Sequence, residues 1–113
     1  MNLDEILGML SNYTQRNYAQ ARSMPPEFYT SEEVFKLEQE RLFRSQWVCL
    51  GRIQQIPNPG DYFTTNLIDE PLIVVRTNAN EIKVLSNVCR HRGSVIADGS
   101  GNSNVFVCPY HSW

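Results

Sequence analysis

Two short pairs of metal-binding side chains near the C-terminal end constrain the fold of this chain more than any other feature. Cys89 and His91 form the first pair, Cys108 and His111 form the second, and sixteen residues separate His91 from Cys108. Each pair is short enough to lie on one tight loop, and Gly93 suits a sharp turn close to the first pair. We therefore expect a fold that brings two loop tips together around an inorganic group.

The mixed composition of the two pairs favours a Rieske-type [2Fe–2S] cluster. Such a cluster takes two thiolates on one iron and two imidazoles on the other. Cys89 and Cys108 are then the predicted ligands of one iron, and His91 and His111 those of the second. Neutral imidazoles in place of anionic thiolates raise the reduction potential from about −400 mV to roughly −150 to +300 mV. The sequence therefore predicts a mid-potential electron-transfer centre.

Three other interpretations of these residues fit the sequence less well. Zinc also accepts two cysteines and two histidines, but zinc modules usually pair like with like, as Cys-x-x-Cys followed by His-x-x-x-His. Chance placement of buried cysteines and surface histidines is disfavoured because the only two histidines of the chain both fall in the motif. A disulfide between Cys89 and Cys108 needs an oxidising compartment, and nothing near the N-terminus supports export.

The stretch from about Trp47 to Trp113 resembles the N-terminal domain of the large (alpha) subunit of Rieske non-haem iron oxygenases. The resemblance is carried by residues 87–93 (NVCRHRG) and 107–113 (VCPYHSW). This family includes aromatic-ring dioxygenases and quaternary-ammonium monooxygenases. Ser112 is a small departure, because glycine or alanine is more common there in the family. The resemblance implies the same four cluster ligands.

Composition narrows the function classes further. A formal net charge of −2 gives no reason to expect nucleic-acid binding, and no run of eighteen apolar residues is present to span a membrane. The first six residues are acidic where a signal peptide would be basic. We therefore expect a cytoplasmic protein. Cys49, the third cysteine, lies in an apolar stretch and is predicted to be a buried strand residue.

Helices are predicted before residue 46. Leu3, Ile6, Leu7 and Leu10 recur at helical spacing, which indicates an amphipathic helix to about Tyr13. Its apolar stripe packs either on this domain or on another subunit or domain. Residues 23–26 (SMPP) form a linker, and Thr30 with Glu33 suggests a capping box for a helix from about Ser31 to Arg44.

The remaining chain is predicted to be mainly β. Five strands are expected, at 47–52, 61–67, 72–77, 82–88 and 105–108, with turn-forming residues between them and a flexible crossing at 98–102. We predict a Rieske-type antiparallel β-sandwich that carries the ligand loops at one end, preceded by N-terminal helices and incomplete at its C-terminus. The expected domains are a helical segment, 1–45, and a [2Fe–2S] domain, 46–113.

The family resemblance implies a second metal site that this chain does not supply. Oxygenases of this family activate O₂ at a mononuclear iron held by two histidines and a carboxylate, and both histidines here are assigned to the cluster. No catalytic residue is therefore predicted, and a further domain is expected to hold that iron. The implied partners are a reductase or ferredoxin donor, a small-molecule substrate, and copies of the subunit or a beta subunit. A stand-alone Rieske ferredoxin and a choline-, betaine- or carnitine-type monooxygenase subunit are the alternatives.

Four side chains beside the ligands have open roles. Arg90 and Arg92 either steer an acidic electron donor or form solvated ion pairs. Tyr110 either donates a hydrogen bond to a cysteine sulfur or packs over its loop. Trp113 is expected to shield the cluster from water.

Overall fold

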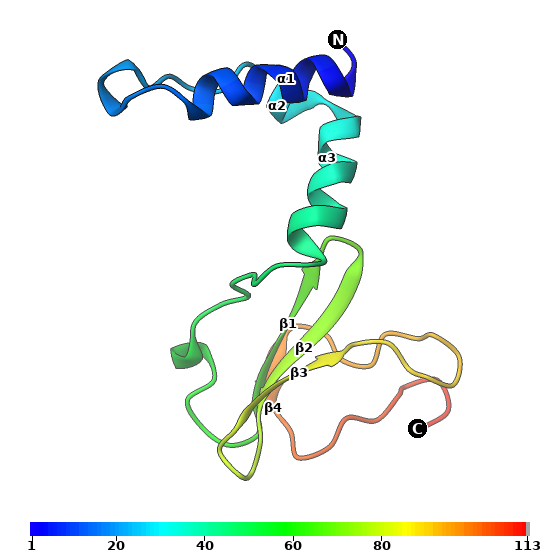
Figure 1. Ribbon diagram of the computed structural model, residues 1–113. Helices are drawn as coiled ribbons and strands as arrows, with labels where there is room; N and C mark the ends of the chain where they lie inside the picture. The colour runs from blue at the N-terminus through cyan, green and yellow to red at the C-terminus, as the bar shows by residue number, and fades with distance from the viewer. Residues whose placement is uncertain (113) are drawn as a thin grey trace. The chain divides into compact units, whose positions relative to one another are not determined.

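The computed structural model describes residues 1–112 and divides into two compact units (Figure 1). The first unit runs from Met1 to Trp47, and the second begins at Val48. Within residues 1–112 none of the helices has the length and apolar character needed to cross a membrane.

The first unit is helical, as predicted. Helix α1 spans Leu3–Thr14 and confirms the amphipathic pattern, with Ile6 buried. Its start is fixed by a capping box, because the Asn2 side chain accepts from the Glu5 backbone N–H and the Glu5 carboxylate accepts from the Asn2 backbone N–H, both at 2.9 Å. A short 3₁₀ turn follows at Tyr18–Gln20.

The second predicted helix is present but is capped differently. Helix α2 covers Glu27–Thr30, helix α3 covers Glu32–Glu38, and a π-helical turn continues over Gln39–Phe43. The predicted cap, Thr30, instead ends α2, and its hydroxyl donates back to the Pro26 carbonyl. Ser31 caps α3 by accepting from the Val34 N–H at 3.3 Å. The prediction was wrong by one position. Thr30 and Ser31 are both favoured N-cap residues, and the glutamate three residues after Thr30 pointed to Thr30.

The second unit contains one antiparallel four-stranded sheet in the order β3-β2-β1-β4, which confirms the predicted antiparallel β class. In chain order the strands are β1 Asp61–Leu67, β2 Glu70–Arg76, β3 Ile82–Ser86 and β4 Ser100–Asn102. The β1–β2 hairpin turns tightly through Ile68, whose φ is +59°. Three predicted strands are thus confirmed as β1, β2 and β3, with ends shifted by at most two residues.

Two predicted strands do not form, and one strand was missed. Residues 47–52 and 105–108 form no regular secondary structure and join no ladder. In both segments alternate side chains still turn inward, so their apolar alternation reflects packing without strand pairing: Val48 and Leu50 line the pocket described below, and Cys108 is buried. The predicted flexible crossing instead contains β4, where Gly101 lies so close to the Tyr62 ring that a Cβ would stand 3.3 Å from its hydroxyl oxygen.

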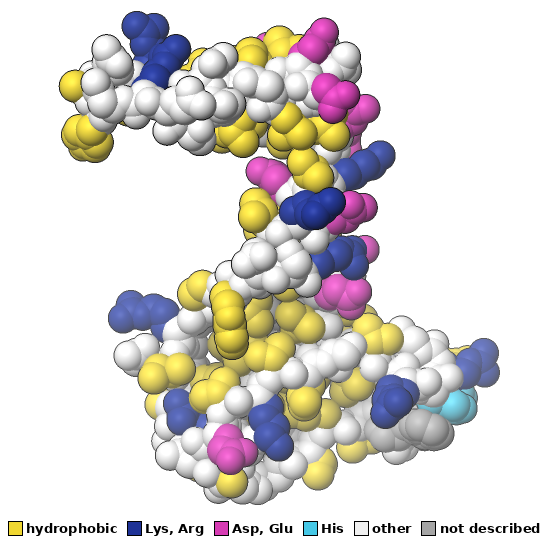
Figure 2. Space-filling view, in the orientation of Figure 1, with side chains coloured by type: hydrophobic (Ala, Val, Ile, Leu, Met, Phe, Trp, Pro, Cys, Tyr) yellow, Lys and Arg dark blue, Asp and Glu magenta, His cyan; other side chains and the backbone are white. Residues whose placement is uncertain are grey.

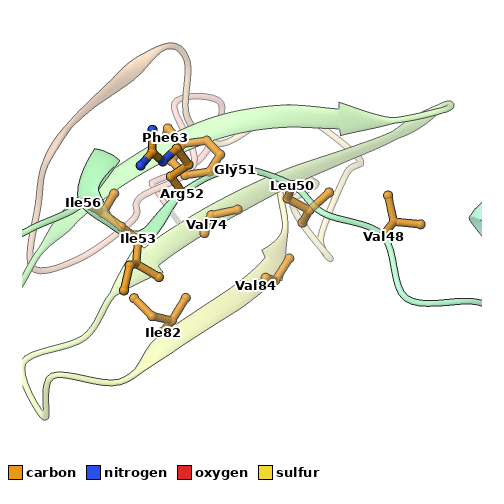
Figure 3. A pocket seen from close by; sticks show the side chains of 10 residues that line it. All are labelled: Val48, Leu50, Gly51, Arg52, Ile53, Ile56, Phe63, Val74, Ile82 and Val84. Carbon is orange, nitrogen blue, oxygen red and sulfur yellow. The ribbon is translucent and has the colours of Figure 1, made fainter.

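The sheet core is apolar and one of its faces is hollowed. Ile73, in the middle of β2, is 1% exposed, and Val74 and Val75 beside it are also buried. A pocket of about 210 Å³ lies between the 48–56 segment and side chains of β1, β2 and β3. Figure 3 shows its lining residues, which include Phe63, Val74 and Val84. None of the predicted ligand residues lines this pocket. Cys49, predicted to be buried, is exposed instead, while its neighbours Val48 and Leu50 line the pocket.

Candidate metal centre

The first ligand loop leaves the end of β3 and folds back on itself. An isolated bridge joins Val88 to Val95, and the Cys89 N–H donates to the Ser94 carbonyl at 2.7 Å. The Gly93 N–H in turn donates to the Cys89 carbonyl at 2.9 Å, with Gly93 at φ +73°. This left-handed conformation is readily available to glycine. Cys89 is 5% exposed, whereas His91 at the loop tip is exposed.

The second ligand loop closes with the same hydrogen bond. The Ser112 N–H donates to the Cys108 carbonyl at 2.8 Å, and Ser112 has φ +61°. Cys108 is 2% exposed and His111 is exposed. The loop is anchored to the sheet where the Phe106 ring meets the edge of Tyr62 in β1, at a centroid distance of 5.1 Å.

The two loops are therefore built on one local plan. In each, a cysteine carbonyl accepts from the backbone N–H four residues later, and the donor residue has a left-handed backbone. In each, the cysteine is buried and the histidine is exposed. The loops differ at the left-handed position, which is Gly93 in the first and Ser112 in the second. A serine there is strained, because its Cβ disfavours positive φ.

The loops meet side by side at one end of the second unit (Figure 1). The His91 and His111 rings are 4.9 Å apart between centroids and inclined by 57°. The Tyr110 ring lies 4.1 Å from that of His111. Figure 2 shows histidine at the surface with basic side chains, Lys or Arg, nearby. The fold thus pairs imidazole with imidazole at the loop tips.

Beneath the histidines, the environment of the Cys108 sulfur lowers the pKa of its thiol. The pKa of the Cys108 thiol is lowered chiefly because the Tyr110 backbone N–H donates to its sulfur, and burial opposes this effect. Smaller contributions come from hydrogen bonds with the Cys89 thiol, the His111 backbone and the Ser94 side chain. The two cysteines therefore lie within hydrogen-bonding reach, and the backbone stabilises the charge that metal binding requires.

This donor set fits a binuclear cluster with two protein ligands on each iron. The thiols form one buried pair and the imidazoles one exposed pair. Backbone N–H groups directed at a ligand sulfur are one of the features that tune iron–sulfur centres. Within residues 1–112 no three His, Cys, Asp or Glu side chains gather closely enough to hold a single metal ion. The assignment of the four residues as ligands stays a prediction.

The flanking side chains have separate roles in the structure. The Arg92 guanidinium lies 5.8 Å from the centroid of the Tyr110 ring, within range of a cation–π contact. The Tyr110 ring packs on His111, which matches the predicted packing role, while its backbone N–H rather than its hydroxyl donates to the Cys108 sulfur. Arg90 is exposed. Trp113, predicted to shield the cluster, lies outside the described residues.

Sequence reasoning missed one residue that supports the site. Asn87 is 3% exposed, and its side chain makes three hydrogen bonds to the far end of the first ligand loop. The available signal was an amide inside the predicted strand 82–88, between Leu85 and Val88, because a buried amide must find partners.

Comparison with known proteins identifies the β unit. The family model described as "Rieske [2Fe-2S] domain" matches residues 46–113, more than half of the chain. The chain belongs to this Rieske family. The match agrees with the two Cys/His loops and with the predicted cluster, which is the family's defining group.

The chain is similar to part of several oxygenase subunits, over stretches longer than the matched Rieske domain. It is 44% identical over 95 residues to the benzene 1,2-dioxygenase alpha subunit of Pseudomonas putida, covering 83% of this chain and 21% of that protein. It is 38% identical over 94 residues to the carnitine monooxygenase oxygenase subunit of Acinetobacter baumannii, covering 82% of this chain and 25% of that protein. The chain therefore spans about a quarter of the length of these relatives.

Solved structures of the same two kinds resemble the model. Naphthalene 1,2-dioxygenase from a Rhodococcus species superposes with a TM-score of 0.80 at 31% identity, covering 99% of this chain and 25% of that one. A quaternary ammonium Rieske monooxygenase superposes with a TM-score of 0.75 at 38% identity, covering 82% of this chain and 27% of that one. The fold is therefore shared with both a naphthalene 1,2-dioxygenase and a quaternary ammonium Rieske monooxygenase.

Proposed function

We propose that the Rieske domain binds a [2Fe–2S] cluster through Cys89 and Cys108 on one iron and His91 and His111 on the other. The observation that carries this proposal is the meeting of two matching loops, with their sulfurs together and their imidazoles together. The domain assignment that follows is a helical segment over residues 1–45 and a cluster domain over 46–113.

The cysteines and the histidines of the two loops have different roles in binding the cluster and in exchanging electrons. When bound, a Rieske cluster accepts and releases one electron at a mid-range potential. Cys89 and Cys108 keep their sulfurs away from water, and the Tyr110 backbone N–H stabilises negative charge on the Cys108 sulfur. The exposed rings of His91 and His111 place the redox centre at the surface, where a partner can approach. A ligated imidazole also carries an N–H on its other nitrogen that can donate a hydrogen bond.

The function that follows is electron transfer within an oxygenase alpha subunit. A reductase or a ferredoxin supplies the electrons, and a mononuclear iron in a further domain uses them for O₂-dependent hydroxylation of an aromatic or related small substrate. Both kinds of relative support this role, since one is a benzene dioxygenase subunit and the other a carnitine monooxygenase subunit. The proposed location is the cytoplasm, and the proposed assembly is an oligomer of alpha subunits, with or without a beta subunit.

Purification of the protein with iron–sulfur assembly factors, followed by iron and sulfide analysis and EPR of the reduced sample, tests the proposal. We expect stoichiometric iron and sulfide with a Rieske-type spectrum. Cys89→Ser and Cys108→Ser are expected to lose the cluster. Cys49→Ser is the matched control, because Cys49 is exposed and lies outside both loops.

A cluster that survives loss of either loop cysteine would contradict the ligand assignment. Stoichiometric zinc in place of iron and sulfide would contradict the proposed function itself. Reduction of the wild-type cluster by a ferredoxin would extend the test to the electron-transfer role, and a cluster that no ferredoxin or reductase reduces would contradict that role.

A further inference from the structure

Asn87 joins the end of the sheet to the far side of the first ligand loop. Its backbone N–H donates to the Pro71 carbonyl at 2.8 Å, next to the paired residues Leu72 and Ser86, so the main chain of Asn87 belongs to the rigid sheet. Cys89 and His91 follow two and four residues later. The position of these two residues therefore depends on how the loop leaves Asn87 and how it returns.

The Asn87 side chain holds the returning segment. Its Nδ2 donates to the Ala97 carbonyl at 2.8 Å, and its Oδ1 accepts from the Ala97 N–H at 2.8 Å and from the Ile96 N–H at 3.1 Å. One side-chain amide thus pairs with both polar groups of Ala97, as a neighbouring strand would. Asn87 is the buried polar residue of the described chain, and burial makes the loss of such partners costly.

Above this amide, the loop closes in successive steps towards the ligands. The Val88–Val95 bridge comes next, followed by the hydrogen bond from Cys89 to Ser94 and then the one from Gly93 to Cys89. Each of these contacts depends on the register of the contact that lies nearer to Asn87. A shift of Ile96 and Ala97 relative to Asn87 would therefore move the segment that carries Cys89 and His91.

We infer that Asn87 is a positioning residue for the cluster, setting the register of the first ligand loop without contacting the metal. This inference rests on the proposed ligand set. Asparagine is the side chain that meets the geometry: aspartate has no donor for the Ala97 carbonyl, and glutamine carries its amide one methylene farther from the backbone. An apolar residue of similar size leaves three backbone groups of Ile96 and Ala97 without partners.

The test compares Asn87→Asp and Asn87→Ser with the wild type and with Asn78→Asp. Asn78 is exposed in the turn between β2 and β3, so its substitution makes the same change from amide to carboxylate away from the loop. Cluster loss is followed by visible absorbance, the cluster environment by EPR and midpoint potential, and the sheet by far-ultraviolet circular dichroism. Both Asn87 variants are expected to keep the sheet, to lose the cluster about tenfold faster, and to shift the EPR spectrum and potential. Asn78→Asp is expected to match the wild type in all four measurements.

Three results would overturn the inference. Wild-type cluster lifetime, spectrum and potential in both Asn87 variants would show that the loop register does not depend on this side chain. Loss of the sheet together with the cluster would make Asn87 a general stabilising residue. A wild-type protein that binds no cluster would remove the proposed ligand set, and this outcome is distinguished from the other two by the wild-type sample alone.

Discussion

Exchanging the residues at the left-handed positions of the two ligand loops should change stability in opposite directions. Gly93 has φ +73° and Ser112 has φ +61°, in otherwise matching hydrogen-bonded turns. A non-glycine residue in this conformation costs roughly 1–2 kcal/mol. Glycine offsets part of that difference, by about 0.4–1 kcal/mol, because it raises the entropy of the unfolded chain. We therefore expect Ser112→Gly to stabilise the protein by about 0.5–1 kcal/mol and Gly93→Ser to destabilise it by a similar amount.

Steric overlap does not complicate the first loop, because a Cβ built on Gly93 meets no atom within 4 Å. Thermal unfolding of the cluster-loaded protein measures both effects, and a change of this size corresponds to a shift of roughly 2–8 °C in a domain of 60–100 residues. Gly99→Ser is a control for left-handed glycine outside the ligand turns. Destabilisation by Ser112→Gly, or no effect of Gly93→Ser, would refute the conformational argument.

Three further predictions concern stability away from the ligands. Ile73→Ala should destabilise the sheet by about 2–5 kcal/mol in denaturant unfolding, because it empties a fully buried site; an effect below 1 kcal/mol would contradict the core assignment. Ser31→Ala should weaken helix α3 by about 1 kcal/mol, more than Thr30→Ala, as judged by helical circular dichroism and unfolding; the reverse order would restore the original capping prediction. The pKa of Asp61 is lowered, chiefly by the hydrogen bond from the Asn102 side chain. Its stabilising contribution is therefore present above the unfolded-state value of 3.8 and is lost as pH falls through the lower folded-state pKa. Unfolding midpoints between pH 2 and 6 should show this loss in the wild type but not in Asp61→Asn.

The parts of the fold that follow local rules could be predicted from sequence. Helix α1 buries one face of a periodic apolar pattern, and strands β1, β2 and β3 are runs of β-favouring residues bounded by turn residues, so these elements are visible in a single sequence. Strand β4 has no such pattern, because Ser100, Gly101 and Asn102 are exposed and pair through their backbone with the edge of β1. The strand predicted at 105–108 was wrong for the opposite reason. These residues show an apolar alternation, but it comes from packing and not from strand pairing.

The same distinction applies to the site. The types and spacing of the predicted ligand residues could be recognised in the sequence, because cluster chemistry restricts both. The support given by Asn87 depends on Ile96 and Ala97 returning to the strand end, which is a property of the folded loop. The left-handed backbone of Ser112 could not be predicted either, because a serine, unlike a glycine, gives no indication of positive φ.

The most direct test of the account is pulsed EPR on the reduced protein with ¹⁵N-labelled histidine. Coordination by His91 and His111 predicts electron–nuclear coupling to two labelled imidazole nitrogens, and His111→Cys is expected to leave coupling to one. A reduced cluster without any histidine coupling would contradict the proposed ligand set and the electron-transfer function built on it.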